Sequence, residues 1–288
     1  MGPGVSAAFS AERLLAHAFP QVRHAWTERD AILYALGVGL GQDPMAGADL
    51  ARLDETRLEV LPTFAVTLAS PGLWVREPSL GVDWVKLLHV AQSAHFLRPL
   101  PPRGEAVGHA RVAGVTDRGA ERGAEMVVER RIVDGASGET LCVLEQTLLM
   151  RGNGGFAAAP APRPVRPEMP ARAADVRRSF ETPPNMALVY RLSGDWNPLH
   201  IDPETACKAG FARPILHGLA SYGLAGWIAA TSFGETPERL ASLGVRFAGV
   251  VTPGDKVDFE LWRGGKRIDF RASVDGRTVL DQGVAELA

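Results

Sequence analysis

The chain has 288 residues, of which 46% are hydrophobic and 22% charged, with a formal net charge of −2. This composition excludes a globally disordered chain, and the charge argues against a nucleic-acid partner, which a basic surplus would signal. The two cysteines, Cys142 and Cys207, are too few for a disulfide scaffold. Residues 1–10 and 285–288 match no targeting signal, so we expect a reducing, cytoplasmic compartment.

The first half reads as helices followed by strands. Thr27 with Asp30 three places on is an N-cap pattern, and it precedes an apolar helical run at residues 31–36. A longer helical pattern is predicted at residues 84–96. Strands are expected at residues 106–115, 125–133 and 140–149.

A linker is predicted in the middle of the chain. Residues 151–174 contain five prolines and a Gly-Asn-Gly-Gly run, and they lack apolar periodicity. The chain therefore divides into a unit at residues 1–150, a linker at 151–174 and a second unit at 175–288.

The second half has a short helix and then a long one. The short helix is expected at residues 186–192, and the long one starts at Pro214, with proline in the first turn. Residues 214–233 are long enough to span a membrane, but their polar residues and missing basic flanks favour a buried helix in a protein with no membrane partner. Strands follow at residues 243–250, 256–262, 267–274 and 279–286, joined by the hairpin signals Gly264-Gly265 and Asp275-Gly276. A long helix followed by an antiparallel meander indicates an α+β fold.

The two halves are similar to each other. The run ILYALGVG at residues 32–39 aligns with LVYRLSGD at residues 188–195, and each precedes a loop that ends in Asp-Pro. Features that recur in the same order at a constant offset suggest duplication of one structural unit.

The densest polar cluster lies between the two helices of the second half. Asp195, Asn197 and His200 fall within six residues, and Pro198 forces a turn between them. A carboxylate and an imidazole that face one small volume can hold a water and exchange protons with it. The alternative is that these are ordinary turn and cap residues, as Asp202 before a proline is expected to be.

A second candidate feature is Gly218, near the start of the long helix. The first N–H groups of a helix have no partner within it, and a glycine lets a substrate oxygen approach closely, which would make an oxyanion site. The alternative, which the sequence alone favours, is that Gly218 and Gly223 permit close helix packing.

These motifs together resemble a known family. The runs YRLSGDWNPLHID at residues 190–202, KAGF at 208–211 and PILHG at 214–218 are similar to the hydratase 2 motif of the MaoC-like enoyl-CoA hydratases. In the first half, residues 27–39 and LPTF at residues 61–64 resemble the hydratase unit of the peroxisomal multifunctional enzyme type 2.

The resemblance implies a fold and a reaction. The fold would be a double hot-dog, in which each unit is an antiparallel sheet wrapped around a long central helix. The reaction would be reversible hydration of a trans-2-enoyl-CoA to a (3R)-3-hydroxyacyl-CoA in fatty-acid metabolism, without metal or redox cofactor. By similarity, Asp195 and His200 activate the water, Asn197 helps to hold it, and the Gly218 N–H binds the thioester oxygen. A homodimer is implied as well.

The first half departs from this pattern. Aligning the two tyrosines places Gly39 opposite Asp195 and Pro44 opposite His200, so the first unit has no catalytic pair. We therefore expect one active site per chain and a first unit that holds the acyl chain. A further departure is LHVAQ at residues 88–92, where relatives commonly carry His-Gly-Glu-Gln.

Several alternatives remain at this point. A dehydratase acting on acyl-carrier-protein substrates, an acyl-thioesterase and a non-catalytic acyl-CoA binding protein share the same fold expectation. Arg246, Lys256 and Lys208 are all candidates for binding the CoA phosphates, and no pattern selects among them. His89 and His95 lack metal-ligand spacing, and His217 is interpreted as a core residue or a support for the site.

Overall fold

The computed structural model describes residues 8–162 and 168–288. Part of the predicted linker, residues 163–167, and the first seven residues of the segment searched for a targeting signal lie outside the described residues. The strands are β1 (Val22–Trp26), β2 (Leu87–Phe96), β3 (Gly104–Asp117), β4 (Ala124–Asp134), β5 (Thr140–Met150), β6 (Val176–Glu181), β7 (Leu240–Phe247), β8 (Lys256–Gly264), β9 (Arg267–Val274) and β10 (Arg277–Leu287). The α-helices are α1 (Ala11–Leu15), α2 (Glu28–Gly37), α3 (Gly47–Leu50), α4 (Met186–Tyr190), α5 (Pro203–Lys208) and α6 (Gly218–Thr231). Short 3-10 helices are η1 (Pro62–Thr67), η2 (Trp74–Arg76), η3 (Pro78–Leu80), η4 (Trp84–Lys86), η5 (Arg191–Ser193), η6 (Pro198–His200) and η7 (Pro237–Arg239).

All described strands belong to one antiparallel sheet, in the order β1-β3-β4-β5-β2-β7-β10-β9-β8-β6. From the centre of the sheet outward, the first half runs β2-β5-β4-β3-β1 and the second half runs β7-β10-β9-β8-β6. Numbered within its own half, each series is the second, fifth, fourth, third and first strand. The halves are joined through β2 and β7, which pair from Ala91 opposite Arg246 to His95 opposite Ser242. This repeated topology confirms the α+β double hot-dog expectation.

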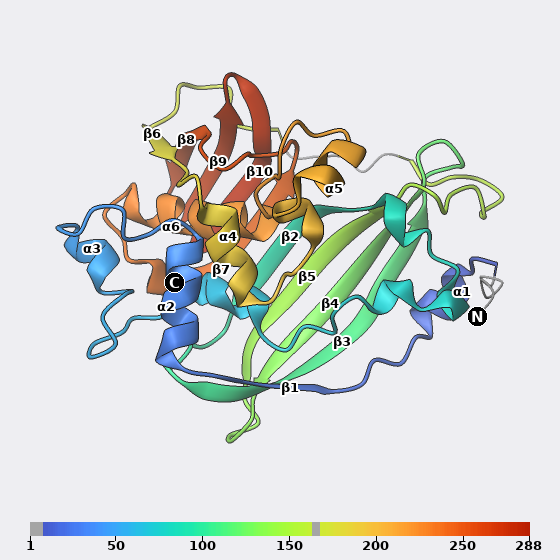
Figure 1. The fold of residues 1–288 in the computed structure, drawn as a ribbon, viewed down its shortest axis with the longest axis horizontal. Coiled ribbons are helices and arrows are strands. Elements are labelled where there is room, and N and C mark those ends of the chain that lie inside the picture. Colours follow the sequence, from blue (N-terminus) through green and yellow to red (C-terminus); the bar gives the residue numbers. More distant parts are fainter. Residues whose placement is uncertain (1–7, 163–167) are drawn as a thin grey trace.

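The helices lie against one face of the sheet, and the core forms between them (Figure 1). Helix α6 is buried along nearly its whole length and packs against β7, β10, β2 and η1. Helices α2 and α4, which carry the aligned tyrosines, lie side by side, and the ring centroids of Tyr34 and Tyr190 are 5.9 Å apart. The core therefore runs without interruption through both halves.

Several local predictions are confirmed. Thr27 and Asp30 form the expected capping box at the start of α2. The Asp202 side chain caps α5 by accepting hydrogen bonds from the N–H groups of Glu204 and Thr205. The turn between β9 and β10 has positive φ at both Asp275 and Gly276, as a tight hairpin requires.

The helix predicted at residues 84–96 is wrong. Residues 84–86 form the 3-10 helix η4, and residues 87–96 form strand β2. β2 pairs with β5 on one side and β7 on the other, so it is a central strand of the sheet. A largely apolar run of this length is ambiguous between helix and strand, and here the two strand partners decide.

Two other helix predictions need correction. The first unit contains no long central helix among its described residues; the short helix η1 is buried at that place and contacts α6. The long helix of the second unit begins at Gly218 rather than Pro214. The intervening residues are held in non-helical conformations because the N–H of Leu216 bonds to the carbonyl of Val251 and that of Ile215 to the carbonyl of Leu199.

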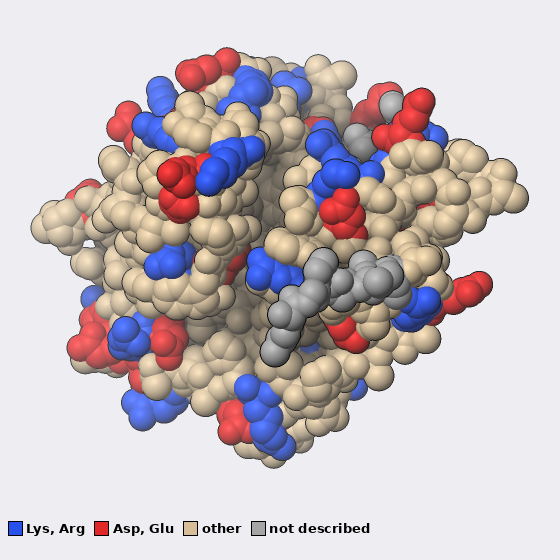
Figure 2. All heavy atoms as spheres, turned by 45° about the vertical axis from the view of Figure 1, so that its right-hand side comes forward, with Lys and Arg blue, Asp and Glu red and all other residues tan. Residues whose placement is uncertain are grey.

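No described helix is long and apolar enough to cross a membrane. On the face shown in Figure 2, acidic and basic side chains are interspersed around a central hollow, and no single basic patch dominates. The division into units at residues 150 and 175 stays a prediction, although β5 ends at Met150, β6 begins at Val176, and the described residues between them form no helix or strand.

Candidate active site

The loop after η5 turns sharply and presents a polar cluster. Gly194 ends η5 with φ of +113°, a conformation that favours glycine. The Asp195 carboxylate accepts a hydrogen bond from the N–H of Asn197 (3.2 Å), and the Asn197 side chain accepts one from the N–H of Leu199 (3.1 Å). Asn197 therefore caps η6. Asp195 and Asn197 are exposed, whereas His200, at the end of η6, is 8% exposed.

His200 is held in one tautomer by the backbone. Its Nδ1 lies 2.8 Å from the carbonyl oxygen of Ile215, and because a carbonyl can only accept, Nδ1 carries the proton. Burial lowers the pKa of His200, although the Ile215 carbonyl and the Asp195 charge partly oppose the shift. The ring is therefore neutral at neutral pH, and its Nε2 has a free lone pair that can accept a proton.

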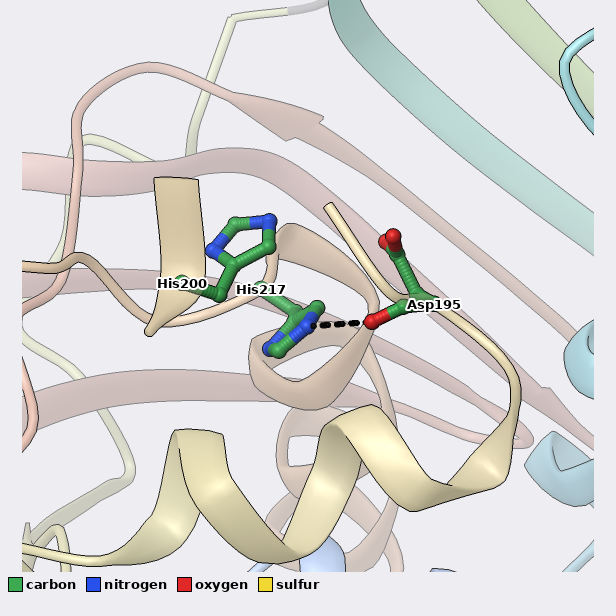
Figure 3. Close-up of side chains that lie close together, drawn as sticks. All are labelled: Asp195, His200 and His217. Carbon is green, nitrogen blue, oxygen red and sulfur yellow. Dashed lines mark hydrogen bonds between the residues drawn. The ribbon is translucent and has the colours of Figure 1, made fainter. Parts of the chain in front are cut away.

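Asp195, His200 and His217 come together at the site (Figure 3). One ligand atom from each lies within 4.8 Å of the others. The separation between a carboxylate oxygen and a ring nitrogen is therefore short enough for one water to bridge them. The expected pairing of Asp195 with His200 thus has the required proximity.

His217 forms the floor of this cluster, a position that the sequence did not reveal. Its ring stacks on that of His200 with centroids 3.6 Å apart, and its Nε2–H donates to the backbone carbonyl of Asp195 (3.3 Å; dashed in Figure 3). Burial, and then the neighbouring His200, lower its pKa to about 4. His217 is thus a neutral support that fixes both catalytic candidates, consistent with its interpretation as a supporting residue.

The same three residues are candidate metal ligands, but their orientation does not suit one ion. The two imidazole rings are inclined by only 28°, so their nitrogen lone pairs run side by side. A tetrahedral metal site needs ligands that converge on one point. In addition, Nδ1 of His200 and Nε2 of His217 already donate to backbone carbonyls. This arrangement is better suited to holding a water than a metal.

Gly218 and Gly223 have different reasons to be glycine. A Cβ at Gly223 would lie 2.5 Å from the Tyr34 hydroxyl and 2.6 Å from Val38 Cγ1, so tight packing explains this glycine. A Cβ at Gly218 would meet only the Phe247 ring, at an ordinary 3.4 Å. Gly218 is exposed at the first position of α6, and its N–H has no hydrogen-bond partner among residues 8–162 and 168–288. Packing therefore does not account for Gly218, and its N–H is available to a ligand.

The first unit also contributes to this region, through His89. The His89 ring lies edge-on to Phe247 with centroids 5.0 Å apart, and Phe247 in turn borders Gly218. The pairing of β2 with β5 has a bulge at Val90, next to His89, and the Nε2–H of His89 donates to the Ala91 carbonyl (2.9 Å). Burial lowers the pKa of His89 to about 4, and the Asp195 charge opposes this shift. The only sign of this position in the sequence was the run LHVAQ at residues 88–92, which keeps the histidine and the glutamine of the His-Gly-Glu-Gln pattern.

The three candidate phosphate-binding cations occupy different surroundings. Arg246, which pairs with β2 near the site, already forms an ion pair with Asp281 (2.6 Å). Lys208 pairs with Glu204 on the exposed side of α5, and Lys256 is exposed at the start of β8. None is selected by these contacts.

Comparison with known proteins covers both halves of the chain. Residues 164–283 match the model of the MaoC-like domain, and residues 24–152 match that of the N-terminal domain of MFE-2 hydratase 2. The peroxisomal enoyl-CoA hydratase 2 of Arabidopsis thaliana is 37% identical over 94% of this chain and 94% of its own. The 3-hydroxyacyl-thioester dehydratase Y of Mycobacterium tuberculosis is 39% identical over 91% of this chain and 92% of its own. The crystal structure of a MaoC-like dehydratase from Phytophthora capsici has a TM-score of 0.81 at 30% identity, covering 96% of this chain and 98% of that one.

Proposed function

This chain belongs to the MaoC-like family that includes the hydratase 2 enzymes, and we propose that it catalyses reversible hydration of trans-2-enoyl-CoA to (3R)-3-hydroxyacyl-CoA in fatty-acid metabolism. One observation carries the proposal. The Asp195 carboxylate and a ring nitrogen of His200 lie close enough for one water to bridge them, and the unprotonated Nε2 of His200 can accept a proton. Gly218, whose N–H has no partner among the described residues, lies next to His217 as the first residue of α6.

The reaction needs three groups, and the site offers each of them. Neutral His200 takes a proton from the water as its oxygen attacks the β-carbon of the enoyl group. Negative charge then moves to the thioester oxygen, where the Gly218 N–H, at the positive end of the α6 dipole, stabilises it. Asp195 orients the water, and protonated His200 then gives the proton it took to the α-carbon, so that one H and one OH are added and the neutral imidazole is restored.

The first unit is proposed to hold the acyl chain rather than to react. Its aligned position Gly39 has φ of +97°, and a Cβ there would lie 2.7 Å from the Phe180 ring. An aspartate at this position would need a strained left-handed backbone and a shift of the Phe180 ring. We propose one active site per chain, with its water between Asp195 and His200 and with Asn197 positioning the loop.

Hydration is tested by following the conjugated absorbance of crotonyl-CoA and of longer enoyl-CoA substrates. We expect Asp195→Asn and His200→Gln to lower kcat by roughly a hundredfold to ten-thousandfold with the fold intact. Asp202→Asn is the matched control, because it changes a carboxylate of the same loop that only caps α5. Unchanged rates in both site variants, or a product with the opposite chirality at the third carbon, would overturn the assignment.

The same assay separates the alternative activities. A thioesterase would release free thiol, which a thiol reagent detects, whereas a hydratase would not. A dehydratase that requires acyl carrier protein would turn over the carrier-bound substrate and ignore the CoA ester. A non-catalytic binding protein would bind the ester without loss of absorbance.

Assembly and location complete the proposal. We propose a homodimer and a cytoplasmic location, although one relative is named as peroxisomal. Light scattering after gel filtration tests the first, and imaging of the tagged full chain in its native cell tests the second. A monomeric mass or an organellar signal would contradict them.

A further inference from the structure

The inner face of the first unit contains an unexpected charge. Strand β4 alternates, and its inward positions Met126, Val128 and Ile132 are buried apolar residues. Arg130 has the same parity and therefore points to the same face. In the second unit the corresponding place is taken by the long helix α6, whereas among the described residues of the first unit it is taken by the short helix η1. Arg130 thus faces the region where the central helix is shortened.

The Arg130 guanidinium is poorly compensated. It donates one hydrogen bond to the Val66 carbonyl at η1 (2.6 Å), and its buried Nε has no partner among residues 8–162 and 168–288. Within the described part of the chain, no carboxylate forms an ion pair with it. Burial lowers the pKa of Arg130 to about 10, so it stays charged at neutral pH. The residue as a whole is half-buried.

Two other polar groups flank Arg130. Gln146 of β5 lies opposite Val128, which makes it a diagonal neighbour of Arg130 on the same face, and its amide has no hydrogen bond among the described residues. The Tyr190 hydroxyl is buried and has no hydrogen-bond partner among the described residues, and it interacts electrostatically with Arg130. Tyr190 also packs against His217, with ring centroids 4.9 Å apart. A line of side chains therefore leads from the reaction site to Arg130.

We propose that Arg130, with Gln146 and the Tyr190 hydroxyl, binds a carboxylate at the far end of the acyl group, so that the protein accepts enoyl-CoA substrates with a terminal carboxylate. This inference rests on the proposed function and names its substrate class. A carboxylate would supply the counter-charge that the protein does not, and its two oxygens match the fork of the guanidinium. The amide of Gln146 would donate to a remaining lone pair.

The test compares two enoyl-CoA series of equal chain length, one ending in a methyl group and one in a carboxylate. We expect wild-type protein to favour the carboxylate series by kcat/KM at the length that reaches Arg130. Arg130→Met should lower kcat/KM for that substrate by roughly tenfold to hundredfold and leave the methyl-terminated substrate unchanged or improved. Arg131→Met is the matched control, since Arg131 is exposed on the opposite face.

An equal loss for both substrates in Arg130→Met, or no loss for either, would overturn the inference. If that variant fails to fold, Arg130→Lys and Gln146→Leu take its place, and each must lower the preference for the carboxylate while sparing the methyl series. If wild-type protein hydrates no enoyl-CoA, the proposed function fails by itself. Calorimetric binding of a saturated, carboxylate-terminated acyl-CoA to wild type and Arg130→Met then decides the subsite separately.

Discussion

Gly223→Ala should destabilise the protein without changing its chemistry. The new methyl would lie 2.5 Å from the Tyr34 hydroxyl and 2.6 Å from Val38 Cγ1, both closer than van der Waals contact. Neither neighbour can yield easily, because both are fully buried in the core. Overpacking of this kind costs up to about 3 kcal/mol, and alanine returns about 1 kcal/mol of helix propensity. We expect a net loss of about 2 kcal/mol and a Tm lower by roughly 4–8 °C.

Gly218→Ala should leave the stability of the protein unchanged and lower its activity. Its methyl would meet only the Phe247 ring at 3.4 Å, so the free energy of unfolding should stay within about 0.5 kcal/mol of wild type. The same methyl would occupy the approach to the unpaired N–H, and a displacement of the thioester by about 1 Å costs roughly a hundredfold in rate. Thermal unfolding and kcat/KM for crotonyl-CoA are measured on both variants. A Gly223→Ala protein as stable as wild type would refute the α2–α6 packing, and full activity in Gly218→Ala would refute the oxyanion assignment.

Three further results are expected. Burial lowers the pKa of His200, so kcat/KM should stay level as the pH falls to 6.5, the usual histidine pKa, and should decline only below that pH. A decline in kcat/KM centred above pH 6.5 would contradict a neutral, buried base. In that acid range the unfolded chain takes up the proton first, so the free energy of unfolding should also decrease, as urea titration at several pH values would show. Burial raises the pKa of Cys142 to about 12, whereas Cys207 is exposed, so a thiol reagent should modify Cys207 alone in the native protein; fast reaction at both would contradict the buried position. The Arg52 side chain is 5% exposed and forms an ion pair with Glu238 (2.6 Å), which joins the two units. Arg52→Met should therefore lower the free energy of unfolding, measured in urea, by roughly 2 kcal/mol. An unchanged free energy of unfolding would mean that the pair contributes little.

The local conformation of the polar loop was more predictable from sequence than the path of the chain around it. The Asp195–His200 loop is local, and its turn is set by Gly194, Asn197 and Pro198, all of which are visible in the sequence. The strands with clear hairpin turns were predicted for the same reason. By contrast, β2 depends on pairing with β5 and β7, which are distant in the chain, so its own residues did not decide between helix and strand. The edge strands β1 and β6 were missed because each is short and has one partner.

Residues that reach the site only through tertiary contacts could not be predicted from the local sequence either. His217 reaches Asp195 because the segment before α6 is held by hydrogen bonds to the carbonyls of Leu199 in η6 and of Val251 after β7, and these bonds are not visible from sequence spacing. His89 reaches the same region because the β2–β7 ladder joins the two units and the bulge at Val90 interrupts the ladder beside it. Such contacts follow from topology, so they could be proposed only after the strand order was known.

Packing between the two units supports the proposal of one site per chain. At the first unit's aligned position, Gly39 combines a left-handed φ of +97° with a Phe180 ring 2.7 Å from its missing Cβ. Phe180 belongs to β6 of the second unit, so the second unit fills the place where a first-unit carboxylate would stand. An aspartate there would be strained by its backbone and would also collide with Phe180. This packing supports the proposal that the first unit has no reaction site, whereas Arg130 faces the place where the central helix of that unit is shortened.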